Sequence, residues 1–472
     1  MLSFFDSSSP LRSPSRRCFL RIGGLSLGGL GAGGLALSDV LALRALAGNS
    51  KPVLRDKSVI FLFMHGGPSQ FETFDPKMEA SSSIRSRTGA VTTSIPGVSF
   101  GGTFEKLAQR AHLLSVVRSF ATGDGNHDIK PIVGKATMNA NMGSLYSRVA
   151  GPMRDRTAMP TNVALFPRAV QSTAGPTITN FGNFSSTSDL GSGYAPFVPG
   201  SGGSLQEDMQ LNLPQARLFE RKRLLQALDQ GKRLLLETDA IQGSEALRGL
   251  AFDALLHGVS DAFDLDQEDR QVVARYDTSQ LFQADRINKK WNNHKHYADH
   301  GTTIGKLLLL ARRLCERGCG FVTVTTSFVW DMHADVNNAP MKEGMSYVGA
   351  PFDHAVSALI DDIEARGLSD KILLVCCGEM GRTPTINNQG GRDHWGNLSP
   401  LLLYGGGLKM GQVIGQSTRD GGQPASDPVN QQDLVYTIMN TLLDLGEVRL
   451  LDGLSKNLLD TFSRGSLIPG LH

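Results

Sequence analysis

Short, continuous apolar runs mark the expected strands of this chain. Ser58–Met64 (SVIFLFM) and Ile372–Cys377 (ILLVCC) lack the alternation of a half-exposed strand, and such runs are typical of parallel strands buried on both faces. The β-branched stretch Phe321–Val329 (FVTVTTSFV) has the same character. The apolar pattern therefore predicts strands over residues 58–64, 112–119, 321–329, 372–377 and 401–404.

Segments with helical periodicity separate these strands. The pattern predicts helices over residues 104–111, 303–317, 352–366 and 431–445. Strands and helices that alternate along a chain are the signature of a largely parallel sheet with right-handed crossovers. The sequence therefore predicts an α/β fold.

The composition changes between about residues 150 and 300. Residues 171–204 are poor in large aliphatic side chains, which favours a long surface loop that lids or lines a site. Spaced leucines predict a helix over 215–239, and two more helices are expected over 245–256 and 266–274. We expect one large domain over 48–472, with this block as a helical and loop insertion or cap.

The N-terminal residues 1–47 resemble a twin-arginine export signal. Arg16-Arg17 precedes Phe19-Leu20, a glycine-rich apolar run and the small-residue site Ala45-Leu46-Ala47. This predicts export of the folded protein by the twin-arginine translocase to the periplasm or beyond. The alternative is a membrane anchor, which the short, glycine-diluted run does not favour.

Charge and cysteine content exclude several classes of protein. A net charge of +2 with 19% charged residues, and no stretch that interleaves basic and aromatic residues, argues against nucleic acid as a partner. Of five cysteines, one lies in the expected signal. We interpret the other four as small core residues, the alternatives being a disulfide framework or a zinc cluster.

Histidines and carboxylates follow the predicted strands. Because ligands bind outside the carboxyl ends of strands in open α/β sheets, we expect these side chains to converge there. They suit a divalent metal, with zinc favoured and manganese, magnesium or calcium as alternatives. The alternative for each such residue, taken singly, is that it caps a helix or satisfies a loop. The candidate ligands are His65, Asp75, Asp331, His333, Glu379, Asp393 and His394.

Two further segments hold candidate chemistry. His127 follows the glycine-containing loop after strand 112–119, and the segment from there to Met138 has helical potential apart from Pro131, so His127 would lie near a helix N-terminus that favours an anion. The histidine-rich segment 291–300 suggests either a metal site or a solvated loop, and its polarity favours the loop.

Four motifs resemble those of the domain of unknown function 1501 proteins, which are related to the alkaline phosphatase and sulfatase superfamily. They are HGGPSQFETFDPK (65–77), WDMH (330–333), GEMGRTP (378–384) and GRDHWG (391–396), together with the segment around His127. The resemblance covers nearly the whole mature chain. It implies an alkaline-phosphatase-like three-layer α/β/α sandwich, with one or two divalent metals at strand ends.

The resemblance also implies roles for single residues. Asp331 and His333 fall where the superfamily places an Asp and a His on one metal, and His394 resembles the late histidine that closes that site. Glu379 falls at the position of the second metal, and Ser69 or Asp75 at that of the first-strand ligand.

This sequence departs from the superfamily pattern at the nucleophile. It has no Cys-x-Pro-x-Arg motif, which argues against a formylglycine sulfatase, and His127 stands near the usual nucleophile. Either His127 is nucleophile or ligand, or Thr122 supplies a hydroxyl, or metal-bound water attacks. Arg382 would neutralise charge on the transferred group or act as a structural ion-pair partner, and Asp393 would orient His394.

The sequence thus predicts an exported, metal-dependent hydrolase of phosphate or sulfate esters, acting on a small-molecule or glycan ester. One alternative is a catalytically idle binding protein that keeps the fold and a structural metal. Another is a carbohydrate-binding module that uses the loop 171–204, whose aromatic residues are Phe181, Phe184, Tyr194 and Phe197.

Overall fold

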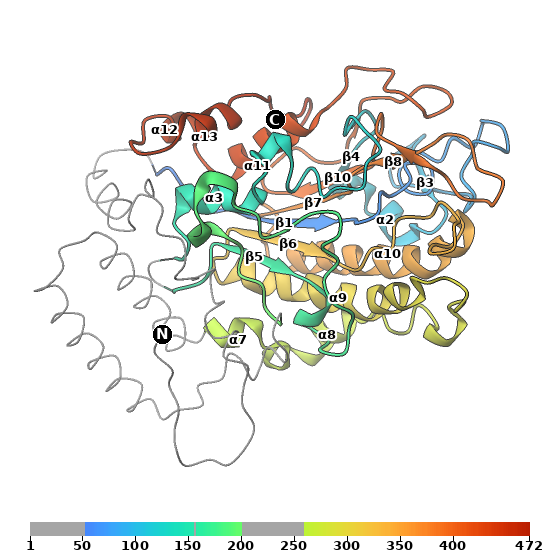
Figure 1. Ribbon diagram of the computed structural model, residues 1–472, viewed down its shortest axis with the longest axis horizontal. Coiled ribbons are helices and arrows are strands. Elements are labelled where there is room, and N and C mark those ends of the chain that lie inside the picture. The colour runs from blue at the N-terminus through green and yellow to red at the C-terminus, as the bar shows by residue number, and fades with distance from the viewer. Residues whose placement is uncertain (1–51, 155–156, 201–258) are drawn as a thin grey trace, which may run out of the picture.

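A seven-stranded sheet forms the centre of the protein in a computed structural model, which describes residues 52–154, 157–200 and 259–472. The strands lie in the order β11-β4-β10-β7-β1-β6-β5. All of them except β11 are labelled in Figure 1. Their bounds are β1 Ser58–Phe63, β4 Leu114–Val117, β5 Asn162–Leu165, β6 Phe321–Thr325, β7 Ile372–Cys377, β10 Leu401–Gly405 and β11 Val413–Ile414.

Six of the seven strands share one direction. β1 pairs in parallel with both β6 and β7, β5 pairs in parallel with β6, and β11 with β4. β10 is antiparallel to both of its neighbours, β7 and β4. The prediction of a mostly parallel sheet is confirmed, and β10 is its one reversed strand.

Helices cover both faces of the sheet and make the fold a three-layer α/β/α sandwich (Figure 1). Alternate residues of β1 enter two separate apolar cores, with Ile60 and Leu62 in one and Phe61 and Phe63 in the other. The first core contains α2 Glu105–Gln109, α9 His294–Glu316 and α10 Met341–Ala365. The second contains α3 Met142–Ala150, α11 Gln431–Leu442, α12 Leu445–Val448 and α13 Lys456–Thr461.

The smaller elements lie around this frame. Two hairpins are made by β2 Ala90–Thr92 with β3 Ser99–Gly101, and by β8 Gly381–Arg382 with β9 His394–Trp395. The short helices α7 Val259–Phe263 and α8 Arg270–Arg275 precede α9. The helix predicted over 266–274 overlaps α8, which begins four residues later and ends one residue later. Within the described ranges, no helix is both long and apolar enough to cross a membrane.

Two predictions of local structure are wrong. The histidine-rich segment 291–300 is not a solvated loop, because α9 begins at His294 and buries His300, whose Nδ1 lies 2.8 Å from Thr326 Oγ1. The helix expected after His127 does not form, and the segment contains only a 3₁₀ turn over Lys135–Thr137. Pro131, which lacks an N–H, and the extended Gly134 interrupt the helical pattern there.

Other expectations fall partly or wholly outside the described residues. The signal at 1–47 and the helices at 215–239 and 245–256 lie in the parts of the chain that the structure does not describe. Within the block expected as an insertion, β5 Asn162–Leu165 joins the central sheet beside β6. The segment after β5 runs through 3₁₀ turns without a strand over the described residues 171–200, as expected for a long loop.

Candidate metal centre

The loops that leave β1, β6 and β7 meet at the carboxyl edge of the sheet. Gly66 follows β1 with a φ of 115°, and a Cβ atom there would lie 2.6 Å from the backbone nitrogen of Asp331. Only glycine therefore lets the β1 loop pack directly on the β6 loop. This close packing brings residues far apart in sequence into one cluster.

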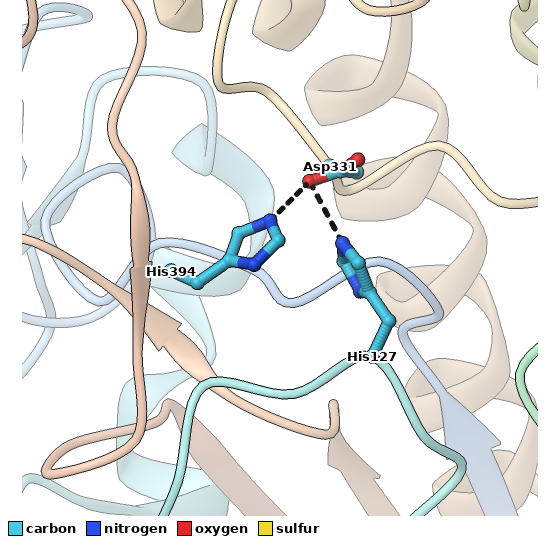
Figure 2. Close-up of side chains that lie close together, drawn as sticks. All are labelled: His127, Asp331 and His394. Carbon is cyan, nitrogen blue, oxygen red and sulfur yellow. Dashed lines mark hydrogen bonds and ion pairs between the residues drawn. The ribbon is translucent and has the colours of Figure 1, made fainter.

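Asp331 lies at the centre of the cluster. Its Oδ1 lies 3.3 Å from His127 Nε2 and 3.3 Å from His394 Nε2, and both imidazoles point at this carboxylate in Figure 2. Its Oδ2 lies 3.0 Å from His333 Nε2 and accepts a hydrogen bond of 2.9 Å from Asn338 Nδ2. Three imidazoles thus surround one buried carboxylate.

The hairpin β8–β9 supplies two of these partners together. Its register places Arg382 directly opposite His394. Arg382 Nη2 donates to Asp331 Oδ1 at 2.7 Å, so both hairpin strands reach the same carboxylate oxygen. A two-residue pairing therefore fixes the guanidinium and the imidazole relative to each other.

Glu379 holds His127 from the other side. Glu379 is fully buried, and its carboxylate accepts hydrogen bonds from the backbone N–H of Gly66 at 2.9 and 3.1 Å. His127 Nδ1 lies 3.2 Å from Glu379 Oε1. His127 therefore bridges two carboxylates, one on each ring nitrogen.

The carboxylates shift the protonation of the histidines. Burial lowers the pKa of His127, but Asp331 and Glu379 outweigh burial and raise this pKa to about 9. Asp331 also raises the pKa of His333. Burial alone would raise the pKa of Asp331, yet Arg382 and the surrounding histidines hold it well below its ordinary value. Asp331 is consequently a carboxylate at neutral pH.

His65 lies beside the cluster in an aromatic environment. Burial lowers its pKa to about 4, so the ring is neutral, and its buried Nε2 has no hydrogen-bond partner among the described residues. Its ring packs against Phe63, Phe184 and Phe328 at centroid distances of 5.5, 5.8 and 4.9 Å. A neutral imidazole with a free nitrogen is suited to be a ligand.

The donors fit a divalent ion. His127, Asp331 and His394 each offer one atom, and these three atoms lie within 4.8 Å of one another. Tetrahedral zinc with Zn–N distances of about 2.0–2.1 Å requires ligand atoms about 3.3 Å apart. The distances from Asp331 Oδ1 to both imidazole nitrogens are 3.3 Å. The contact between His127 and Glu379 is the carboxylate–histidine arrangement that orients metal-bound histidines.

Three of the residues expected at the site have other partners. Asp75 lies 3.2 Å from Lys77 Nζ and 3.7 Å from Arg118 Nε. Asp393 is exposed and accepts from Asn387 Nδ2 at 3.0 Å. Thr122 Oγ1 donates to the carbonyl of Gly396 at 3.4 Å.

Ser69 is also held elsewhere, since its Oγ donates to Glu72. The other seven candidates lie together as His65, His127, Asp331, His333, Glu379, Arg382 and His394.

Arg382 faces protein rather than an open site. It is fully buried, and besides Asp331 it donates to the carbonyls of Gly67 at 2.7 Å and Arg392 at 3.2 Å, and to that of Gly66. These contacts favour the structural ion-pair partner over a group that touches a transferred phosphate or sulfate.

Sequence reasoning missed Asn338, Phe328 and Lys130 near the cluster, and it named Phe181 only as an aromatic residue of the loop 171–204. Asn338 supports Asp331, and Phe181 and Phe328 pack on His127 with ring centroids 5.0 and 4.9 Å away. Lys130 ties the loop that carries His127. Apart from the position of Phe328 inside the strand predicted over 321–329, nothing in the local pattern distinguishes these residues from loop residues in general.

Comparison with known proteins identifies one family. The family model described as "Protein of unknown function (DUF1501)" matches residues 56–452. No curated protein matches the chain.

Several solved structures resemble the chain over most of its length. The lipoteichoic acid synthase LtaP from Listeria monocytogenes is 9% identical with a TM-score of 0.31, and the match covers 86% of this chain and 78% of that one. The PsFucS1 sulfatase from Pseudoalteromonas sp. is 12% identical with a TM-score of 0.29, covering 86% and 70%. The alkaline phosphatase from the Antarctic bacterium TAB5 is 12% identical with a TM-score of 0.27, covering 81% and 97%.

Proposed function

This chain belongs to the DUF1501 family, and we propose that it is an exported, metal-dependent hydrolase of phosphate or sulfate esters. The observation that carries the proposal is the set of imidazoles around the buried Asp331 at the carboxyl edge of the sheet. Zinc suits the donors best, and manganese, magnesium or calcium are the alternatives. The twin-arginine signal proposed at 1–47 accounts for export to the periplasm or beyond.

The chain's own residues would hold the ion and tune its ligands. His127, Asp331 and His394 are the proposed core ligands, with His333 and His65 beside them. With an ion bound, His127 would donate Nδ1–H to Glu379 and offer Nε2 as the ligand atom. A divalent ion held there would neutralise charge on the ester and lower the pKa of a water molecule to about 7.

The geometry favours water over a side-chain nucleophile. The hydroxyls of Thr122 and Ser69 donate to Gly396 and Glu72, and both nitrogens of His127 face carboxylates. The thiols of Cys376 and Cys377 are buried, which raises their pKa and keeps them protonated. We therefore assign His127 to the ligands and leave Thr122 without a catalytic role.

The exposure of the histidines indicates where a substrate would enter. The side chains of His333 and His394 are 24% and 33% exposed, whereas Glu379 is fully buried. A small-molecule or glycan ester would therefore approach from the side of His333 and His394.

Metal content tests the proposal directly. We expect the exported protein, purified from the periplasm, to contain a stoichiometric divalent ion by mass spectrometry and to hydrolyse aryl phosphates or aryl sulfates. The His127→Ala and His394→Ala variants should bind the ion more than about 100-fold more weakly, because loss of an outer partner alone costs about 10–100-fold. Asp75→Asn and Asp393→Asn serve as matched controls, since both side chains have partners outside the cluster.

The results separate the hydrolase from the binding protein. A metal-free wild type, or unchanged metal content in both histidine variants, would contradict the proposed site. The alternative of an idle binding protein is supported by Arg382, because its guanidinium already donates to protein groups rather than facing a substrate. Stoichiometric metal without hydrolysis of either ester class, with zinc, manganese or calcium supplied, would favour that alternative.

A further inference from the structure

One side of the candidate metal centre is lined by aromatic rings. The aromatic wall, as we name it, consists of Phe63, Phe181, Phe184 and Phe328. Phe181 and Phe328 stack with ring centroids 4.7 Å apart and an angle of 22° between their planes. Both rings pack on His127 and on His65. The wall therefore borders the proposed ligands directly.

Another part of the centre is polar. His333 and His394 are partly exposed there, and Asp335 lies 4.0 Å from His333 Nε2. Asp393 and Asn387 follow on the hairpin loop. The centre thus has a charged, partly exposed part and an apolar part. An ester likewise has a charged group and an alcohol portion that differ in polarity.

Phe181 is the member of the wall that keeps partial exposure, although its ring also contacts Phe328 and His127. Phe63, Phe184 and Phe328 are buried, whereas Phe181 keeps partial exposure. It comes from the long loop between β5 and the helices, and Gly182 of that loop packs on Ile129, two residues beyond His127. The loop therefore meets the segment that carries a proposed ligand.

We propose that Phe181 selects esters whose alcohol presents a flat apolar face, and that this face stacks on the Phe181 ring while the charged group lies toward Asp331. This inference rests on the proposed function. An aromatic contact of this kind strengthens binding by about 2- to 13-fold beyond the effect of the area that it buries. It would thus favour a ring-bearing ester over a small alkyl ester that has the same charged group.

Non-hydrolysable analogues test the proposal without turnover. We would titrate the metal-loaded, full-length protein with phenylphosphonate and with methylphosphonate by calorimetry, and use phenylsulfonate and methanesulfonate as the sulfate pair. The wild type should bind the phenyl analogue of one pair about tenfold more tightly than its methyl analogue. Phe181→Leu should lower this ratio by about 3- to 10-fold.

Two further variants keep the test decisive. Phe181→Tyr retains a ring and should restore the wild-type ratio, which a general disturbance of the loop would not allow. Tyr194 lies in the same loop, and its ring packs against Arg148. The control variant Tyr194→Leu should therefore leave the ratio unchanged. An unchanged ratio in Phe181→Leu would overturn this inference and leave the hydrolase proposal standing. Failure of the wild type to bind any of the four analogues would overturn the hydrolase proposal itself.

Discussion

The hairpin that borders the candidate metal centre carries two arginines, ten residues apart in sequence. Each forms a buried ion pair with a carboxylate from another part of the chain. Arg382 pairs with Asp331 at 2.7 Å, and Arg392 pairs with Glu72 at 3.2 Å. Both guanidinium groups are fully buried, and both also donate to backbone carbonyls. The arginines are thus in closely similar environments, and the difference lies with the carboxylates.

The partners of the two carboxylates differ in chemistry. Glu72 accepts from Arg392, from the hydroxyl of Ser69 and from the backbone N–H of Arg87 at 3.0 Å, and none of these donors is a metal ligand. Asp331 instead has three imidazoles around it, whose nitrogens bind either a proton or a metal. The comparison teaches that a buried ion pair becomes a candidate metal site when its carboxylate is also surrounded by imidazoles, which can exchange a proton for a metal ion.

Replacing each carboxylate by an amide should distinguish the two ion pairs, because the two variants should differ in metal content. Glu72→Gln and Asp331→Asn each leave a buried guanidinium without its counter-charge, which should lower the free energy of unfolding by about 3–5 kcal/mol. Only Asp331→Asn should also lose the metal. We would measure urea unfolding and metal content for both variants, before and after chelation.

Chelation gives the sharper result of this experiment. It should lower the melting temperature of the wild type and of Glu72→Gln, because a bound ion stabilises the folded state, and it should leave Asp331→Asn unchanged. If Glu72→Gln lost its metal as completely as Asp331→Asn, the distinction between the pairs would be wrong.

The pH dependence of stability should also distinguish the two regions. The pKa of His127 is raised to about 9, so its protonation stabilises the folded, metal-free protein fully below pH 6.5. This contribution, at most about 3 kcal/mol, is lost as the pH rises through 9. Metal affinity should rise over the same range, because binding displaces the proton.

Unfolding of the chelated protein between pH 6 and 10 measures this effect. His127→Gln should flatten the loss of stability at high pH, whereas Glu72→Gln should keep the wild-type slope. An equally steep loss in His127→Gln would mean that another group titrates in this range.

Five of the seven central strands could be located from sequence because each is a local apolar run, although the strand predicted over 321–329 ends at Thr325. The run Ile372–Cys377 is the observed β7, and Glu379 follows it at the edge where Asp331 also lies. The reversed direction of β10 could not be predicted, since a short apolar run does not indicate which way its strand runs in the sheet. Nor could β5 be recognised, because its four residues stand within a block of unlike composition.

Which strand-end residues share a site is a property of the tertiary structure. Asp75 follows β1 as Asp331 follows β6, yet Asp75 pairs with Lys77 and Arg118, residues that no local pattern links to it. The enclosure of Arg382 likewise depends on carbonyls contributed by the β1 loop, far away in sequence. Spacing along the chain therefore predicts candidates, and packing selects among them.

The smallest expected effect concerns the loop that brings His127 to Asp331. The ion pair of Glu72 has no such loop carrying a histidine to its carboxylate. Lys130 is buried, and its Nζ donates to Asp124 at 2.7 Å, Asp128 at 3.0 Å and the carbonyl of Asn126 at 3.4 Å. These bonds close the loop on both sides of His127. Lys130→Met should therefore weaken metal binding by about tenfold, as loss of an outer partner does.

A second lysine provides the matched control for that variant. Lys57 donates to the carbonyl of Gly406 at 2.7 Å and lies 3.5 Å from Asp370, just before β1 at the opposite edge of the sheet. Lys57→Met should leave metal affinity unchanged, and Lys130→Arg should restore most of it because the charge is kept. Competition with a chromophoric chelator measures all three variants. Equal losses in Lys130→Met and Lys57→Met would show that Lys130 acts on general stability rather than on the position of His127.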